Sequence, residues 1–182
     1  ILFMVISTLI AQAQKGFEPI IRASYELGID TDKNKSFGLD FLVGYRFAET
    51  IRIGLGTGIY WCEHLYENDG INKLTYKYYD EYRETAAYVP LFVNGKANFI
   101  KKGISPYLSV DLGYSFFIPF SNYAKNNKLG FMVKPALGVD FPINESKIFA
   151  EIGYKYQARK FDLNINDKMN YSQLSIAVGY IF

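Results

Sequence analysis

The sequence predicts an all-β chain that folds as one eight-stranded, antiparallel, up-and-down transmembrane β-barrel. Three observations predict this fold. Apolar residues recur at every second position in eight segments, short and long connections alternate between those segments, and most charges within them share the face opposite the apolar one. The composition agrees, because 18% of the residues are aromatic, with 16 Tyr and 15 Phe, and aromatic side chains favour strands.

Length and composition exclude several classes of protein. A chain of 182 residues suits a single domain. The formal net charge of +2 gives no field that would attract nucleic acid, so we expect no nucleic-acid partner. A single Cys allows neither an internal disulfide nor a zinc site built from several Cys residues.

The first residues have the character of a secretory signal. Residues 1–10 are almost wholly apolar, and residues 11–14 read Ala-Gln-Ala-Gln, which suits a cleavage site. We therefore expect residues 1–13 to be a signal-peptide remnant and residues 14–182 to form the β-barrel domain. The run is too short to cross a membrane as a helix. A buried first strand is the alternative, but residues 1–10 lack alternation.

Eight segments then follow the period of two that is typical of strands. In residues 36–47, for example, Phe37, Leu39 and Phe41 alternate with Gly38 and Asp40. Each segment is about as long as a tilted membrane-crossing strand, roughly ten residues. The predicted strands are 17–29, 36–47, 51–62, 86–99, 104–117, 130–141, 147–159 and 171–182.

The connections alternate in length along the whole chain. Residues 48–50, 100–103 and 142–146 form short connections, whereas the longer ones are 30–35, 63–85, 118–129 and 160–170. Outer-membrane barrels have short periplasmic turns and longer external loops. The pattern therefore predicts that both termini lie on the periplasmic side.

Charged residues within the strands mostly share a face with Gly, Ala and Ser. A charge on the lipid-facing side costs about 2–4 kcal/mol at the membrane midplane, so these residues should point into the lumen. Both signs occur, which predicts an internal ion-pair network in a lumen filled by side chains, with the inward glycines making room for long Arg and Lys side chains. The predicted lumen charges are Arg22, Glu26, Asp40, Arg46, Arg52, Lys96, Asp111, Lys134, Asp140, Glu151, Lys155 and Arg159.

Two features refine this barrel. Aromatic residues gather toward both ends of the strands, as in the interfacial girdles of membrane barrels. Pro90 and Pro135 fall inside predicted strands, where each removes a donor from the hydrogen-bond ladder. We interpret both prolines as bulges or strand-end distortions.

The chain ends in Tyr180-Ile181-Phe182, with apolar residues at alternate positions before it. Together with the strands and loops, this ending resembles the small bacterial outer-membrane β-barrel proteins of the OmpX and OmpA type and the related porin-like family common in Bacteroidetes. The resemblance covers residues 14–182. It implies an outer-membrane location and insertion by the barrel-assembly machinery, with Tyr180 and Phe182 as the assembly signal. Family members differ widely in role, so the resemblance implies no activity.

Motifs for catalysis or cofactor binding are weak. Residues 54–58 are rich in glycine, but they lack the spacing of a phosphate-binding loop and no helix follows them. Cys62, Glu63 and His64 are adjacent, yet the chain has only one Cys and one His to build a metal or nucleophile site. We therefore expect no enzyme activity, no catalytic residue, no cofactor and no metal.

The connection 63–85 carries a cluster of tyrosines among charged residues. Such rings give rigid contact area with a polar tip, which suits an external binding loop for an extracellular protein or glycan ligand. The alternative, which we favour, is that two strands extend above the membrane and pair their tyrosines across the hairpin. The tyrosines concerned are Tyr66, Tyr76, Tyr78, Tyr79 and Tyr82.

The sequence thus predicts an integral outer-membrane β-barrel with a structural or surface-interaction role through its external loops. Its expected partners are outer-membrane lipid and the barrel-assembly machinery. A narrow channel for small solutes is the main alternative. A soluble exported barrel that binds a small apolar ligand and an enzyme that uses His64 at its rim are two others.

Overall fold

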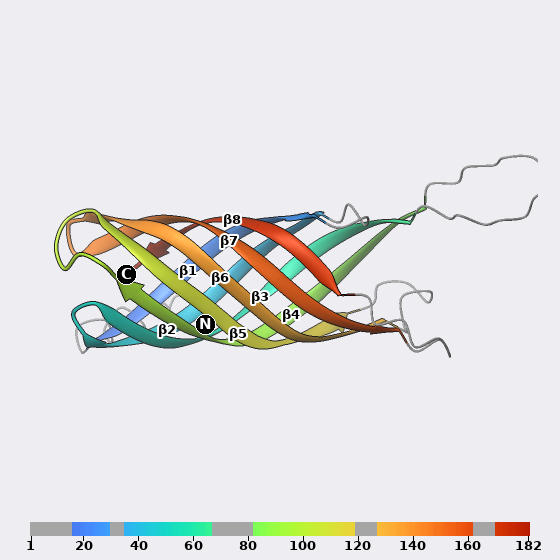
Figure 1. The fold of residues 1–182 in the computed structure, drawn as a ribbon, viewed down its shortest axis with the longest axis horizontal. Helices are drawn as coiled ribbons and strands as arrows, with labels where there is room; N and C mark the ends of the chain where they lie inside the picture. The colour runs from blue at the N-terminus through green and yellow to red at the C-terminus, as the bar shows by residue number, and fades with distance from the viewer. Residues whose placement is uncertain (1–15, 30–34, 67–81, 119–126, 162–169) are drawn as a thin grey trace, which may run out of the picture.

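The computed structural model describes residues 16–29, 35–66, 82–118, 127–161 and 170–182. Eight antiparallel strands form a closed barrel in which each strand pairs with its neighbours in sequence and β8 pairs with β1 (Figure 1). The predicted strand number and topology are confirmed. The strands are β1 (Phe17–Gly28), β2 (Lys35–Ala48), β3 (Ile51–Tyr66), β4 (Tyr82–Asn98), β5 (Ser105–Ile118), β6 (Asn127–Ile143), β7 (Ser146–Phe161) and β8 (Tyr171–Ile181).

The three short connections, 49–50, 99–104 and 144–145, lie at one end of the barrel (Figure 1). Asn144 adopts a left-handed conformation with a φ of 55°, which Asn tolerates better than most residues, and this closes the β6–β7 turn. The strands at the other end lead into the longer connections. The predicted signal remnant, residues 1–13, lies outside the described residues.

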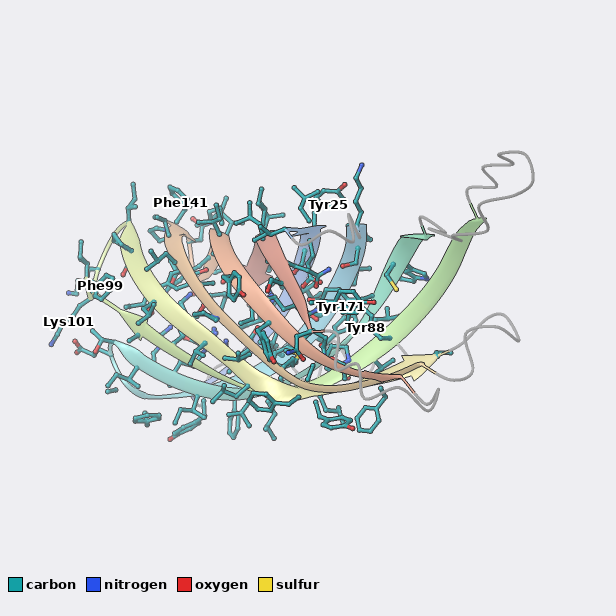
Figure 2. All side chains as sticks on the ribbon, turned by 45° about the vertical axis from the view of Figure 1, so that its right-hand side comes forward. Tyr25, Tyr88, Phe99, Lys101, Phe141 and Tyr171 are labelled. Carbon is teal, nitrogen blue, oxygen red and sulfur yellow. The ribbon has the colours of Figure 1, made fainter. Side chains whose placement is uncertain are left out.

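The barrel wall has inverted polarity, with large apolar side chains outside and charges inside. Leu55 is 69% exposed, whereas Glu26 and Asp40 are fully buried. Tyr25 and Phe141 project outward, and Tyr88 lies inside (Figure 2). A barrel in water would bury the first set and expose the second, so this arrangement suits a wall surrounded by lipid.

The prediction that Pro90 and Pro135 mark bulges or strand-end distortions is wrong. Both lie well inside β4 and β6, and the register continues unchanged across them. At Pro90 the Thr57 hydroxyl donates a hydrogen bond of 2.9 Å to the proline carbonyl oxygen, so a side chain joins the two strands there. The register shifts lie nearer strand ends, at 46–48 and 129–132.

The core of the protein is the lumen, where rings pack as well as charges. Four inward glycines, Gly38, Gly56, Gly138 and Gly179, face an aromatic ring on a neighbouring strand. A Cβ atom on Gly38 would meet the Tyr60 ring, and one on Gly138 would meet Tyr107. The prediction that these glycines make room for Arg and Lys holds at Gly44, which lies against Arg52. The main buried apolar cluster consists of Ile20, Leu42, Phe92, Tyr107, Met132, Phe149 and Ile181.

Candidate functional site: the charged lumen

The middle of the lumen is organised around the Arg22 guanidinium. It donates hydrogen bonds to Asp40 (2.8 Å), Asp111 (2.7 Å) and Glu151 (3.1 Å), which belong to β2, β5 and β7. Because β5 lies opposite β1 in a ring of eight strands, the contact with Asp111 crosses the barrel. All four side chains are buried, so these are buried ion pairs with several hydrogen bonds each.

A second layer lies toward the short-turn end. The Lys96 ammonium binds Asp140 at 2.5 Å, and its nitrogen lies 3.6 Å from the centroid of the Tyr107 ring. The Asn98 amide donates to the same carboxylate at 2.9 Å. Near the short turns, the half-buried Arg46 guanidinium donates two hydrogen bonds to the Glu18 carboxylate.

A third layer lies toward the long-loop end. The Lys155 ammonium donates to Glu26 (2.9 Å) and to the Tyr88 hydroxyl, and it lies 4.5–4.6 Å from the ring centroids of Tyr88 and Tyr60. The two rings are stacked, with centroids 4.8 Å apart. Ser36 donates a hydrogen bond of 2.9 Å to Glu26. Lys155 is therefore enclosed by a carboxylate and two aromatic faces, each of which attracts an ammonium group.

A continuous path of polar contacts joins the Arg46–Glu18 pair near the short-turn end to the Arg22 group. The Asn94 amide lies on this path, since it accepts from Arg52 at 2.7 Å and donates to Asp111 at 2.6 Å. One step of this path is the ion pair between Arg52 and Glu18, at 3.7 Å, and the other steps are hydrogen bonds. In order, the path runs through Arg46, Glu18, Arg52, Asn94, Asp111, Arg22, Asp40 and Tyr60.

The structure places eleven of the twelve predicted lumen charges on the inner face. Ten of these are buried and Arg46 is half-buried. The side chain of Arg159 lies outside the described residues. Lys134 is buried but reaches only Asp111, at 3.7 Å, without a hydrogen bond to any described residue.

Sequence reasoning missed several members of the network. Glu18 lies in phase with Arg22, so the period of two could have identified it. Asn94 is uncharged, and the inward rings of Tyr60, Tyr88 and Tyr107 resemble lipid-facing rings in the sequence. Their signal is phase, because Tyr60, Tyr88 and Tyr107 are separated by an even number of residues from Arg52, Lys96 and Asp111 on the same strands.

The predicted loop residues are only partly described. β3 and β4 extend to Tyr66 and Tyr82, which pair in register, so the backbone here follows the extended-hairpin alternative. Tyr76, Tyr78 and Tyr79 lie outside the described residues, as do the side chains of Tyr66, Tyr82, Glu63 and His64. Cys62 is buried.

The described segments hold neither a group of metal-ligating side chains nor a membrane-spanning helix. No three His, Cys, Asp or Glu side chains in these segments are placed to hold a metal ion. None of the same segments forms a helix long and apolar enough to cross a membrane.

The predicted assembly signal lies at the short-turn end. The Tyr180 and Phe182 rings meet edge to face, with centroids 4.8 Å apart. The Phe182 amide donates a hydrogen bond of 3.0 Å to the Pro19 carbonyl oxygen, which holds the last residue against β1. Tyr180 remains 37% exposed, so its ring is available on the outer face.

Three solved structures with the same architecture are distant from this chain in sequence. The β-barrel domain of Pseudomonas aeruginosa OprF has 15% identity and a TM-score of 0.50, covering 91% of this chain and 97% of that one. OprG from the same organism has 13% identity and a TM-score of 0.54, covering 92% and 96%. Neisserial surface protein A has 12% identity and a TM-score of 0.56, covering 91% and 96%. At this identity they show the fold alone.

Among curated proteins, no sequence matches the chain significantly. The family model described as outer membrane protein beta-barrel domain matches residues 1–182. The finer resemblance to Bacteroidetes members stays a prediction. The chain belongs to the outer membrane β-barrel domain family, and the protein is located in the bacterial outer membrane.

Proposed function

We propose that this protein is a non-enzymatic outer-membrane barrel with a closed lumen, which acts through its lipid-facing wall and its external loops. One observation carries the proposal. Arg22 reaches across the lumen and holds carboxylates from three other strands at once. A side chain in this position occupies the path that a solute would take.

The space left around Arg22 supports a closed lumen. The cavity between Arg22, Arg52 and Lys96 measures about 10 Å³, roughly the space that one water molecule needs. Eight strands enclose only enough room for side chains. Opening a path would mean separating buried ion pairs, and breaking one such pair costs about 3–5 kcal/mol.

The charges of the described wall also argue against a pore selective for one sign of ion. Selective pores use rings of like charge, whereas here the signs are balanced and mixed at every level. The six inward cations are Arg22, Arg46, Arg52, Lys96, Lys134 and Lys155. The six inward carboxylates are Glu18, Glu26, Asp40, Asp111, Asp140 and Glu151.

Planar-bilayer recordings test the closed lumen. The refolded wild-type barrel should give no discrete conductance steps over long recordings. Gel migration must first show that the preparation is folded, so that an absence of conductance cannot be due to unfolded protein. Reproducible unitary steps from the folded wild type would contradict the proposal and favour the alternative, a narrow channel for small solutes.

The surface role belongs to the hairpin that leaves the membrane through β3 and β4. Tyrosines with flanking charges suit a protein or glycan ligand. Changing Tyr76, Tyr78 and Tyr79 together to Ser should reduce binding of whole cells to arrays of glycans and extracellular proteins. Equal binding by both strains, at equal amounts of folded barrel, would refute a ligand at this loop.

Insertion by the barrel-assembly machinery is the remaining part of the proposal. The exposed Tyr180 ring and the terminal Phe182 support it. Phe182→Ala should lower the amount of folded barrel in cells while leaving refolding of the purified chain unchanged. An equal effect in both settings would show a structural role instead.

A further inference from the structure

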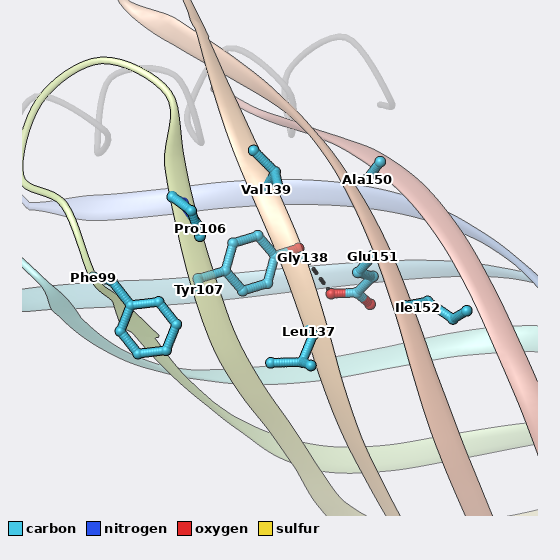
Figure 3. Close-up of a pocket in the computed structure, with 9 residues that line it drawn as sticks. All are labelled: Phe99, Pro106, Tyr107, Leu137, Gly138, Val139, Ala150, Glu151 and Ile152. Atoms are coloured by element: carbon cyan, nitrogen blue, oxygen red, sulfur yellow. Dashed lines mark hydrogen bonds between the residues drawn. The ribbon is translucent and has the colours of Figure 1, made fainter.

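A groove of about 560 Å³ lies on the outer wall, over β5, β6 and β7 near the short-turn end (Figure 3). Its volume falls within the range of small-molecule sites, about 300–1,000 Å³. Tyr107, Gly138 and Glu151 lie behind its floor, where the Tyr107 hydroxyl donates to the Glu151 carboxylate at 2.9 Å. The outward residues that line the groove are Phe99, Pro106, Leu137, Val139, Ala150 and Ile152.

The strand register explains the shape of this groove. Pro106, Val139 and Ala150 are neighbours across β5, β6 and β7, and all three have small or compact side chains. Leu137 and Ile152 form the next row and rise above that floor. Phe99 closes the side at β4, where its amide donates a hydrogen bond of 2.9 Å to the Pro106 carbonyl oxygen. The lining is therefore apolar, with a low floor between taller walls.

The groove lies in the periplasmic half of the barrel. Pro106 is the second residue of β5, and Ala150 is the fifth residue of β7. Strand residues rise about 3.3 Å each, and the apolar band of such barrels is about 25 Å tall. These positions are therefore within reach of acyl chains from the periplasmic leaflet, which consists of phospholipid.

The turn beside the groove is positively charged. Phe99 is followed by Ile100 and then by Lys101 and Lys102, and this turn, 99–104, carries no acidic residue. The other two short turns contain Glu49 and Glu145 instead. Lys101 forms an exposed pair with Glu49 at 2.9 Å, whereas Lys102 has no ion pair with a described residue. A free lysine at the membrane surface attracts anionic headgroups.

We propose that this groove binds an acyl chain of an anionic phospholipid in the periplasmic leaflet, with Lys102 and the adjacent Lys101 holding its phosphate. The apolar lining matches the acyl chain, the position near the short turns matches the periplasmic leaflet, and the lysines match the anionic headgroup. The site goes beyond the proposed function, because it does not depend on whether the lumen conducts.

Native mass spectrometry of the refolded full chain in detergent tests the site, with phosphatidylglycerol or phosphatidylethanolamine added. The wild type should retain one phosphatidylglycerol. Ala150→Phe fills the floor of the groove and should lower that retention about tenfold. Lys102→Gln should lower phosphatidylglycerol retention about fivefold, the contribution expected of one lysine near a membrane surface, and leave phosphatidylethanolamine unchanged.

Two matched variants serve as controls. Ala23→Phe adds the same ring to the outer face of β1, and Lys35→Gln removes a lysine at the opposite end of the barrel. Both should retain phosphatidylglycerol like the wild type. Folding of every variant is checked by its gel migration, and Lys102→Gln lies in an exposed turn where folding is not at risk.

Three results would overturn the proposal. The first is unchanged phosphatidylglycerol retention in a folded Ala150→Phe or Lys102→Gln barrel. The second is an equal loss in the controls. The third is a dimer that Ala150→Phe dissociates without altering lipid retention, because the groove would then belong to a second copy of the chain.

Discussion

At the scale of single residues, Arg22 shows how a charge can be stable inside a membrane protein. Its three carboxylate partners supply an acceptor for Nε, Nη1 and Nη2 alike. Burial makes each of these charges costly unless it is paired. The same burial makes loss of the cation strongly destabilising, because Asp40, Asp111 and Glu151 would then face one another in the lumen.

Arg22→Ala should therefore lower the free energy of unfolding by about 3–5 kcal/mol, the usual cost of breaking a buried ion pair. Urea unfolding in lipid vesicles measures this, with the single tryptophan, Trp61, as the fluorescent reporter. Arg46→Ala is the control. It removes a cation from a half-buried pair and should cost only about 1 kcal/mol. Equal losses in the two variants would contradict the central place of Arg22.

Glycines in the wall offer a second comparison between residues. A Cβ atom on Gly113 would press on the Leu91 carbonyl oxygen and lie 2.7 Å from the Phe92 Cα atom, and neither backbone atom can move aside. On Gly95 the nearest atom would be 3.7 Å away. Gly113→Ala should cost about 1–3 kcal/mol of unfolding free energy, whereas Gly95→Ala should be close to neutral. Similar values for both would show that the wall adjusts freely.

At the scale of strands, the sequence predicts the barrel closely because lipid imposes strict alternation. At the short-turn side, the strand predicted as 51–62 begins at the same residue as β3, and the one predicted as 86–99 ends one residue beyond β4. Both predictions miss the extension to Tyr66 and Tyr82. Strands that leave the membrane no longer need an apolar outer face, so their pattern fades and resembles a loop. The inward rings of Tyr60, Tyr88 and Tyr107 were missed although their phase with inward charges on the same strands identifies them, because residue type alone does not separate a lumen ring from a lipid-facing one.

The two prolines within strands show that a residue unfavourable for a strand can be held in one by the surrounding sheet. A closed barrel has no free edge, yet β4 keeps the same register with β3 on both sides of Pro90, and the Thr57 hydroxyl donates a hydrogen bond to the Pro90 carbonyl oxygen. Thr57→Val retains the shape and removes the donor, so it should cost about 1 kcal/mol of unfolding free energy. Urea unfolding measures this as well. Unchanged stability would mean that the Thr57 hydroxyl does not support the strand at Pro90.

At the scale of the whole molecule, inverted polarity and the filled lumen have one origin. Lipid accepts only apolar side chains on the outer face, so the charges of eight strands must satisfy each other inside. The sequence could predict which charges turn inward, because phase is local. It could not predict their partners, because Arg22 and Glu151 lie 129 residues apart and meet only when the barrel closes.

The central claim is a closed barrel stabilised in a membrane by this polarity. Gel migration after refolding into lipid vesicles tests it most directly. A folded membrane barrel should resist SDS, so unboiled and boiled samples should migrate at different positions, and the folded form should require lipid or detergent. A chain that refolds without either, and migrates identically before and after boiling, would contradict the claim.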